Sequence, residues 1–296
     1  MKKIFCSLLA ILLVAVGCTN EEKLLDRPVM RKSVTSVKAS FEESAVTRTH
    51  FLDDTKLTWD AGDVIQVFSD LQKNASPFTY QGNDVFSGEA VNYDETIYAF
   101  YNPAGYAVVD WETKTVQATF PNSLVHNPDA YADPTFMVAR SGNSELKFMQ
   151  TVSILKFSLT GTKHITKLAL AGNNGEAIAG VGTIDLSSDE PVVIFDGEGE
   201  TSIVMQADVT LDMESPTSFY FQLPEMVLEA GFTLTLEGDD ATTGDTFKVE
   251  KRLDNRFVPK RAYVYSFTSV DVDDIIPVEG EAEGEELPVN DEPYYV

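Results

Sequence analysis

Apolar and polar residues alternate along most of the chain between residues 36 and 267, and this pattern predicts β-strands. In residues 155–159, and again in residues 232–236, apolar side chains take every second position. A period of two places one side of a strand against a core and the other side toward solvent. Residues 64–68 are apolar at almost every position, as expected for a strand that is buried on much of both faces.

Turn residues separate these segments at intervals of roughly ten residues, a spacing typical of all-β sandwiches. The predicted strands cover residues 36–41, 56–59, 63–68, 96–101, 106–109, 115–120, 155–159, 165–170, 180–186, 192–195, 201–205, 219–223, 232–236, 247–251 and 263–267. Asp60-Ala61-Gly62 is predicted to be a tight turn, because these residue types favour turns. Residues 121–134 hold three prolines and are predicted to be a long loop. We therefore predict an all-β fold.

A further turn, at residues 141–143, is the expected boundary between two domains. The chain has 296 residues, which is too long for one small sandwich. We therefore predict an N-terminal β-sandwich over residues 35–143 and a C-terminal β-sandwich over residues 144–270.

The N-terminus has the layout of a bacterial lipoprotein signal. Lys2 and Lys3 precede an apolar run over residues 4–16, and a Gly-Cys pair that ends in Cys18 closes the run. The run is too short to span a bilayer as a helix. The pair resembles a lipobox, which implies that residues 1–17 are removed as a signal peptide and that acylated Cys18 holds the chain in membrane lipid. The alternative is an ordinary secretory signal with an incidental cysteine.

A polar segment at residues 18–34 follows this signal. It contains Pro28 and shows no clear period, so we expect a flexible linker. Within it, Glu21 and Glu22 resemble the acidic export signal that sends lipoproteins of some Gram-negative anaerobes to the outer face of the outer membrane. The alternative is a linker that is merely charged.

The C-terminal segment, residues 271–296, has ten acidic residues and no basic residue. Such a composition buries too little apolar surface to offset the entropy of ordering, so we predict an acidic disordered tail. Its two apolar segments, residues 274–278 and 294–296, are candidates for docking into a partner. The alternative is a tail that stays in solvent.

The net charge limits the possible partners, and the cysteine content limits the possible disulfide bonds. The formal net charge is −25, which argues against binding to nucleic acid, because such binding needs basic patches that displace counterions. The only cysteines are Cys6, inside the predicted signal, and Cys18. The mature chain therefore has no disulfide bond.

Catalytic patterns do not stand out in the sequence. His50, His126 and His164 lie far apart, and none has the spacing of a metal-ligand pair. We find neither a nucleophile elbow nor a phosphate-binding loop. We expect no enzymatic activity and no cofactor.

Two acidic loops and two tryptophans are weaker candidates for ligand sites. The loops contain Asp239, Asp240 and Asp245, and Asp271, Asp273 and Asp274. Neither follows the spacing of a calcium-binding EF-hand loop, so solvated hairpin loops are favoured over calcium sites. Trp59 and Trp111 could stack on sugars. Trp59 precedes a turn and is expected to close a core, whereas Trp111 lies at a predicted hairpin tip.

Several segments together resemble one protein family. They are residues 47–49 (Thr-Arg-Thr), residues 59–68, the aromatic strand and proline of residues 98–103, residues 154–161, residues 165–170 and residues 178–180. Their order is similar to that in the fimbrillin-like proteins, which are lipoprotein precursors of fimbrial subunits and related surface proteins of Gram-negative gut and oral anaerobes. The resemblance covers about residues 35–270.

This resemblance implies two tandem transthyretin-like Greek-key β-sandwich domains and a surface location on the outer membrane. It also implies that a trypsin-like protease cuts after an arginine near the N-terminus, removes the lipid anchor with a leading strand, and opens a groove for a strand of the next subunit. Arg27, Arg31 and Arg48 are the candidate cleavage sites, each of which could equally be a surface cation. Other fimbrial subunits are then the expected partners. The alternative function is a monomeric surface lipoprotein that binds glycan or host protein.

Overall fold

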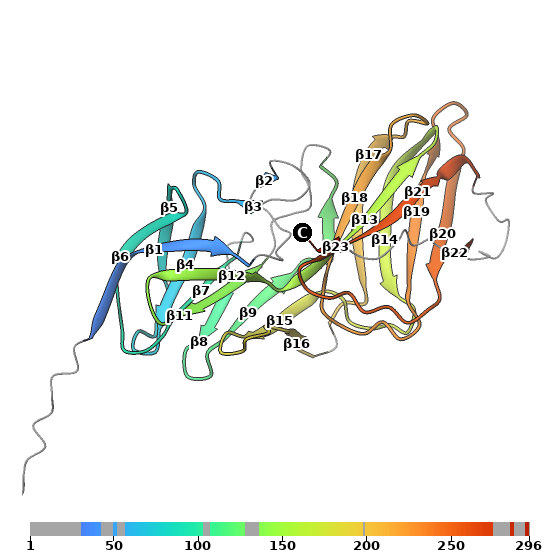
Figure 1. Cartoon of the computed structure of the whole chain (residues 1–296). Helices are drawn as coiled ribbons and strands as arrows, with labels where there is room; N and C mark the ends of the chain where they lie inside the picture. The colour runs from blue at the N-terminus through green and yellow to red at the C-terminus, as the bar shows by residue number, and fades with distance from the viewer. Residues whose placement is uncertain are drawn as a thin grey trace, which may run out of the picture. The chain divides into compact units, whose positions relative to one another are not determined.

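The computed structural model describes residues 31–42, 50–51, 57–102, 107–127, 136–197, 199–274, 285–286 and 294–295. The chain divides into two units, Met1–Met30 and Arg31–Val296, and all the described strands belong to the second unit. The predicted all-β class is confirmed: the described residues form strands joined by turns, with one short 3-10 helix, η1 (Val272–Asp274) (Figure 1). Within these ranges no helix has the length and hydrophobicity of a membrane span.

The first sheet closes on itself and includes the N-terminal strand. Its strand order is β1 (Lys32–Phe41), β12 (Glu145–Gln150), β11 (Met137–Ser141), β7 (Ile97–Tyr101), β4 (Val64–Ser69), β5 (Ser76–Gly82) and β6 (Val85–Tyr93), and β6 pairs again with β1. The strands β2 (His50–Phe51) and β3 (Leu57–Thr58) pair only with each other. Apolar side chains from every strand of the closed sheet point inward and share one core.

A second, four-stranded sheet has the order β16 (Val193–Phe195), β15 (Gly180–Asp185), β9 (Thr115–Phe120) and β8 (Ala107–Asp110). Its inner face forms a separate core with the outer side of β4 and β7, where Phe68 stacks on Tyr98 at a centroid distance of 5.3 Å. The pairing of β9 with β15 joins strands from the two sides of residue 143.

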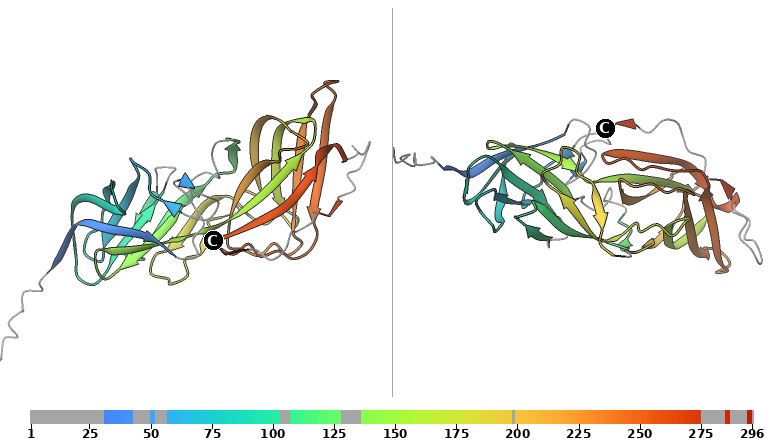
Figure 2. Two further views of the ribbon diagram at one scale, coloured as in Figure 1. Left: turned by 45° about the horizontal axis from the view of Figure 1, so that its top comes forward. Right: turned by 90° about the horizontal axis from the view of Figure 1, so that it is seen from below.

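Two further sheets face each other and form a sandwich (Figures 1 and 2). One has the order β10 (Ser123–Val125), β17 (Ser202–Thr210), β14 (Lys163–Gly172), β19 (Phe232–Asp240), β20 (Thr246–Leu253) and β22 (Glu285–Glu286). The other has the order β18 (Thr217–Pro224), β13 (Val152–Thr160), β21 (Tyr263–Asp271) and β23 (Tyr294–Tyr295). Apolar residues of both sheets form one core between them, with the Phe157 and Phe267 rings stacked 4.7 Å apart.

The boundaries differ from the predicted ones in four places. β1 begins at Lys32, inside the predicted linker. β12 lies beyond residue 143 but belongs to the closed sheet, since it pairs with β11 across the turn at residues 141–143. β21 continues to Asp271, and η1 follows with Val272 buried. β10 lies within the predicted loop, because its parallel pairing with β17 depends on a strand far away in the sequence. The division into two sandwich domains and the disorder of the tail stay predictions.

Candidate functional site

The candidate site is the position of β1 in the closed sheet. β1 pairs in parallel with β12, from Lys38 opposite Glu145 to Phe41 opposite Phe148. On its other edge it pairs antiparallel with β6. The pairing is staggered: residues 32–38 pair with β6 and residues 38–41 with β12, so removal of β1 would leave one unpaired edge beside each part of the gap. We call the gap that β1 fills the β1 slot; its walls are β6 and β12.

The side chains of β1 that point into the slot are apolar and buried. Val34, Val37 and Ala39 are 6%, 2% and 0% exposed, whereas the residues between them face solvent. Val34 and Val37 are three residues apart, and the register with β6 shifts between Val34 and Ser36, where β6 has extra residues opposite β1. Both valines belong to the same core.

Trp59 packs against the C-terminal end of β1. Its Nε1 donates a hydrogen bond to the backbone oxygen of Ala39 at 2.8 Å, and its ring stacks on Phe41 at 4.6 Å. The rings of Phe86 and Phe148, one from each wall of the slot, meet Trp59 edge-on at 4.9 Å and 5.3 Å. Trp59 is 4% exposed, so it closes a core as predicted and is not accessible to a ligand.

Polar contacts also hold β1 in the slot. The hydroxyl of Ser36 donates to the backbone oxygen of Phe86 at 3.2 Å. Directly after β1, the carboxylate of Glu42 accepts a hydrogen bond from Arg261 Nη1 at 2.9 Å. This ion pair joins the end of β1 to the turn before β21. The strand is therefore attached along its length by main chain, side chain and charge.

The sequence-predicted processing sites lie around this strand. Arg31 is exposed and directly precedes β1. Cys18, Arg27 and Arg48 lie outside the described residues, and the roles assigned to all four remain predictions.

The walls of the slot were not predicted from the sequence, although part of the signal is present. Leu146 and Phe148 of β12 are buried at alternate positions, 1% and 0% exposed, while Lys147 between them is exposed. This two-residue alternation could have identified β12. β6 is harder to recognise, because bulges interrupt its pairing with both β1 and β5.

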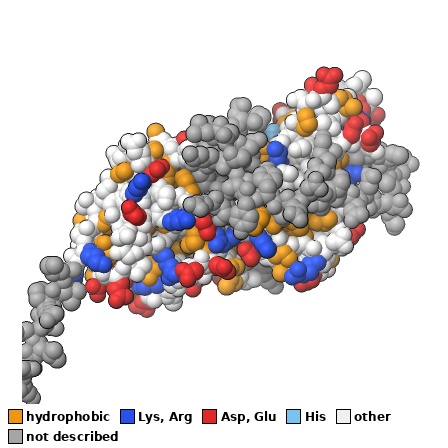
Figure 3. Space-filling view, viewed as in Figure 1, with side chains coloured by type: hydrophobic (Ala, Val, Ile, Leu, Met, Phe, Trp, Pro, Cys, Tyr) orange, Lys and Arg blue, Asp and Glu red, His pale blue; other side chains and the backbone are white. Residues whose placement is uncertain are grey.

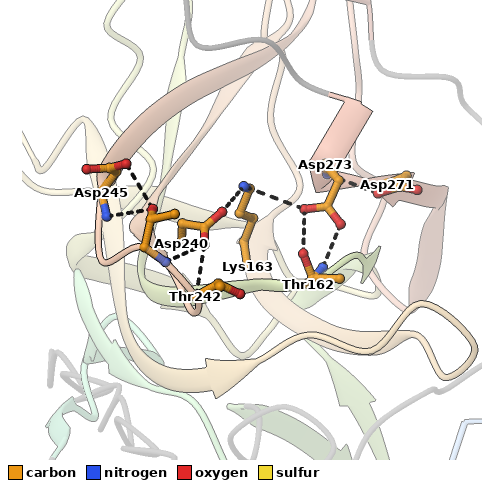
Figure 4. Close-up of polar contacts among 8 residues, drawn as sticks. Thr162, Lys163, Asp240, Thr242, Asp245, Asp271 and Asp273 are labelled. Carbon is orange, nitrogen blue, oxygen red and sulfur yellow. Dashed lines mark hydrogen bonds and ion pairs between the residues drawn. The ribbon is translucent and has the colours of Figure 1, made fainter.

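The two acidic loops considered for calcium come together at one end of the sandwich, around a lysine (Figure 4). The Nζ atom of Lys163 lies 2.6 Å from Asp240 Oδ2 and 3.9 Å from Asp273 Oδ1. The hydrogen bond to Asp240 raises the pKa of Lys163 and holds the pKa of Asp240 well below its usual range. The ammonium group thus occupies the place between the loops. Among the described residues, no cluster of acidic, His or Cys side chains could hold a metal ion.

The three histidines belong to different segments of the structure. His164 lies between Asp208 and Asp239, with ring-nitrogen to oxygen distances of 2.8 Å and 3.1 Å, and these hydrogen bonds raise its pKa. His126 packs on Phe219, and burial lowers its pKa. His50 begins β2.

The charged surface is uneven in the view of Figure 3. Acidic and basic side chains are intermixed over the half that holds the closed sheet, whereas acidic side chains gather toward the end that carries the β19–β20 hairpin. Among the described side chains in this view, the basic ones do not gather into the broad positive face that nucleic-acid binding needs.

Comparisons with known proteins show which solved structures share this fold. No protein-family model matches the chain, and no curated protein matches it in sequence. Among solved structures, it is similar to a candidate cell adhesion protein from Bacteroides ovatus, at 14% identity and a TM-score of 0.51, over 81% of this chain and 93% of that one.

Two other structures are similar at lower scores. One is a candidate cell adhesion protein from Bacteroides uniformis, at 14% identity and a TM-score of 0.48, over 82% of this chain and 95% of that one. The other is the tip fimbrial protein Mfa3 from Porphyromonas gingivalis with a C-terminal truncation, at 11% identity and a TM-score of 0.38, over 81% and 96%. At the level of fold, the similarity to the Bacteroides ovatus structure agrees with the expected resemblance to fimbrillin-like proteins.

Proposed function

We propose that this chain is an adhesion-related cell-surface protein that joins other subunits by exchange of a strand at the β1 slot. The observation that carries the proposal is the position of β1, which is paired on both edges and buries Val34, Val37 and Ala39 between β6 and β12. A gap with two unpaired edges and an apolar floor fits an extended segment of another chain, which gains main-chain hydrogen bonds and side-chain burial together. The fold shared with a candidate cell adhesion protein supports this function.

The proposal includes the finer organisation that the resemblance implies. The chain would fold as two tandem transthyretin-like Greek-key domains, held at the outer membrane by lipid on Cys18. Two or three acyl chains give lasting attachment, since each buried CH₂ contributes about 0.8 kcal/mol. It would have no catalytic role.

The position of the cut decides what is released. Cleavage after Arg27 or Arg31 would separate the fold from Cys18 and leave β1 in place, because β1 begins at Lys32. Cleavage after Arg48 would detach β1 from the rest of the chain. We propose that only the second cut opens the slot, whereas the first releases a closed protein.

The free energy gained when a strand fills the empty β1 slot is large enough to drive assembly. Complete burial of a valine side chain is worth roughly 1.5–3 kcal/mol, so Val34 and Val37 together stabilise an occupied slot by about 3–6 kcal/mol. The main-chain pairs with β6 and β12 add to this. A slot emptied by proteolysis therefore has a strong tendency to take up another strand.

The C-terminal tail is a candidate donor strand. Tyr294–Tyr295 pairs antiparallel with β21, and Glu285–Glu286 pairs in parallel with β20. A tail that adds to sheet edges in its own chain can make the same main-chain contacts with another chain. Deletion of residues 275–296, which keeps the buried Val272, tests this role. Unchanged assembly after the deletion would exclude the tail as donor.

Limited digestion with an arginine-specific protease tests the cut and the assembly together. We expect N-terminal sequencing to find a new terminus after Arg48, and unboiled gels to show a ladder of polymers. Arg48→Lys keeps the charge but resists this protease, so it should stay monomeric. Arg31→Lys is the matched control and should assemble like the wild type. A protein that remains monomeric after complete cleavage at Arg48 would refute strand exchange and favour the alternative, a monomeric binder of glycan or host protein.

A further inference from the structure

Two turns bring a tryptophan and two lysines together at one end of the four-stranded sheet. Lys73 lies in the turn between β4 and β5, and Trp111 and Lys114 lie in the turn between β8 and β9. The Nζ atoms of Lys73 and Lys114 lie 4.4 Å and 4.9 Å from the centre of the Trp111 ring. Lys114 Nζ is also 5.9 Å from the ring of Tyr98. We call these three residues the Lys73–Trp111–Lys114 cluster.

Local hydrogen bonds shape both turns. The Ser69 hydroxyl accepts two hydrogen bonds from the backbone of its own turn, at 3.0 Å and 2.9 Å. The Asp110 carboxylate does the same in the other turn, at 2.9 Å and 3.2 Å. Lys114 donates to the backbone oxygen of Trp111. The cluster is therefore presented by two well-braced turns, with Lys73 exposed and Trp111 half-buried.

The cluster brings two positive charges together in a strongly acidic protein. The chain carries 47 acidic and 22 basic residues, so carboxylate partners are plentiful. Lys163, Lys167 and Arg140 all form ion pairs with them. Lys73 and Lys114 belong to none of the ion pairs found among the described residues, although the Asp110 carboxylate of the same turn lies near enough to Lys114 to interact with its charge. Both ammonium groups lie against one aromatic ring. Both ammonium groups lie within 5 Å of the centre of the same ring, so an anion bound beside that ring would be attracted by two positive charges.

We propose that the Lys73–Trp111–Lys114 cluster binds a sugar that carries a carboxylate or sulfate group. The cation–π contact of an exposed lysine is weak, so the Lys73 ammonium can move from the ring to the anionic group of the ligand. The ring face that it leaves is then free to pack against the C–H groups of the sugar. Lys114, fixed by the Trp111 oxygen, supplies the second charge.

This site is distinct from the β1 slot. Its residues come from the β4–β5 and β8–β9 turns, whereas the walls of the slot are β6 and β12. Sugar binding and strand exchange can therefore succeed or fail independently. A subunit with both would carry its own ligand site into an assembly.

Isothermal titration calorimetry on the full mature chain tests the site at low salt. The probes are tetragalacturonate, which is carboxylated, a heparin-derived tetrasaccharide, which is sulfated, and cellotetraose, which is neutral. We expect at least one acidic probe to bind, and cellotetraose to bind at least about tenfold more weakly. Binding should weaken as salt is added, because the lysines are accessible to solvent.

Variants locate the binding. Lys73→Gln should weaken it about tenfold, since one of two charge contacts is lost. Trp111→Ala should abolish it, and Lys147→Gln, an exposed lysine on β12, should leave it unchanged. If Trp111→Ala fails to fold, Lys73→Gln decides alone, because its side chain is exposed. Absence of binding by both acidic probes, equal binding in Lys73→Gln and Lys147→Gln, or equal binding of tetraglutamate would each overturn the proposal, the last in favour of an acidic peptide.

Discussion

Truncation of Val37 to alanine is the most direct probe of the β1 slot. Val37 is 2% exposed and pairs with Phe86 on the wall of the slot. The change removes two methyl groups, worth about 1.6 kcal/mol in transfer free energy at 0.8 kcal/mol each. The cavity left behind adds roughly 1 kcal/mol, because a packed core relaxes only in part. We therefore expect the free energy of unfolding to fall by about 2–3 kcal/mol.

Two measurements report the effect of Val37→Ala. Thermal unfolding, monitored by tryptophan fluorescence, should show a melting temperature about 5–10 °C lower, as expected for a protein of this size. Trp59 reports on the slot directly, because it donates to the backbone oxygen of Ala39. Uptake of a labelled peptide with the sequence of residues 32–42 should also increase, by roughly 30–150-fold, because the resident strand is held less tightly by the same 2–3 kcal/mol.

Thr35→Ala is the matched control on the same strand. Thr35 faces solvent between the two buried valines, so its truncation should change the free energy of unfolding by no more than about 0.5 kcal/mol. Equal effects of Val37→Ala and Thr35→Ala on melting would mean that β1 is not inserted between β6 and β12. Exchange of β1 at the slot would then be excluded.

Two further predictions concern the C-terminal sandwich. The two carboxylate partners of His164 raise its pKa above 6.5. The stability that protonated His164 contributes to the fold is therefore complete below pH 6.5 and is lost as the pH rises through the raised pKa. Urea unfolding of His164→Gln should show a smaller loss of stability from pH 6 to pH 8 than the wild type; identical slopes would contradict this. Gly231→Ala would place a Cβ 1.8 Å from the Leu253 oxygen, and should cost more than about 3 kcal/mol. Gly244→Ala, with a similar positive φ but open space around it, should cost only about 1–2 kcal/mol by the same assay, and equal costs would exclude the clash.

Strands with an uninterrupted two-residue period were predicted well. Residues 155–159 fall in β13, where Leu155, Phe157 and Leu159 are buried. Residues 232–236 fall in β19, which has the same alternation. The period is a local property, because a strand buried on one face needs an apolar side chain at every second position whatever its neighbours are.

The strands β5, β6, β10, β11 and β12 were not predicted. The buried positions of β6 do not keep a strict alternation, and its pairing with β1 shifts in register between Val34 and Ser36. β10 has three residues and depends on its pairing with β17. No local pattern marks such a strand, since its stability comes from a partner far away in the sequence.

The candidate sites also combine features that are visible in the sequence with contacts that only the folded chain creates. The two acidic loops are visible in the sequence as clusters of aspartates, but Lys163 lies between them only in the folded chain. Likewise, Lys73 and Trp111 are far apart in the sequence and meet because two turns converge. Contacts of this kind depend on sheet order, and alternation of residues does not encode sheet order.

By itself, the sequence determined the all-β class, most of the strands with a regular period and the turns between them, because these follow from backbone preferences and from the two faces of a strand. Only the tertiary structure decided that β1 lies between β6 and β12, that β9 pairs with β15, and which charges meet. Strand pairing joins any two edges whose hydrogen bonds and side chains fit, and the choice among many similar edges is made by the packing of the whole core.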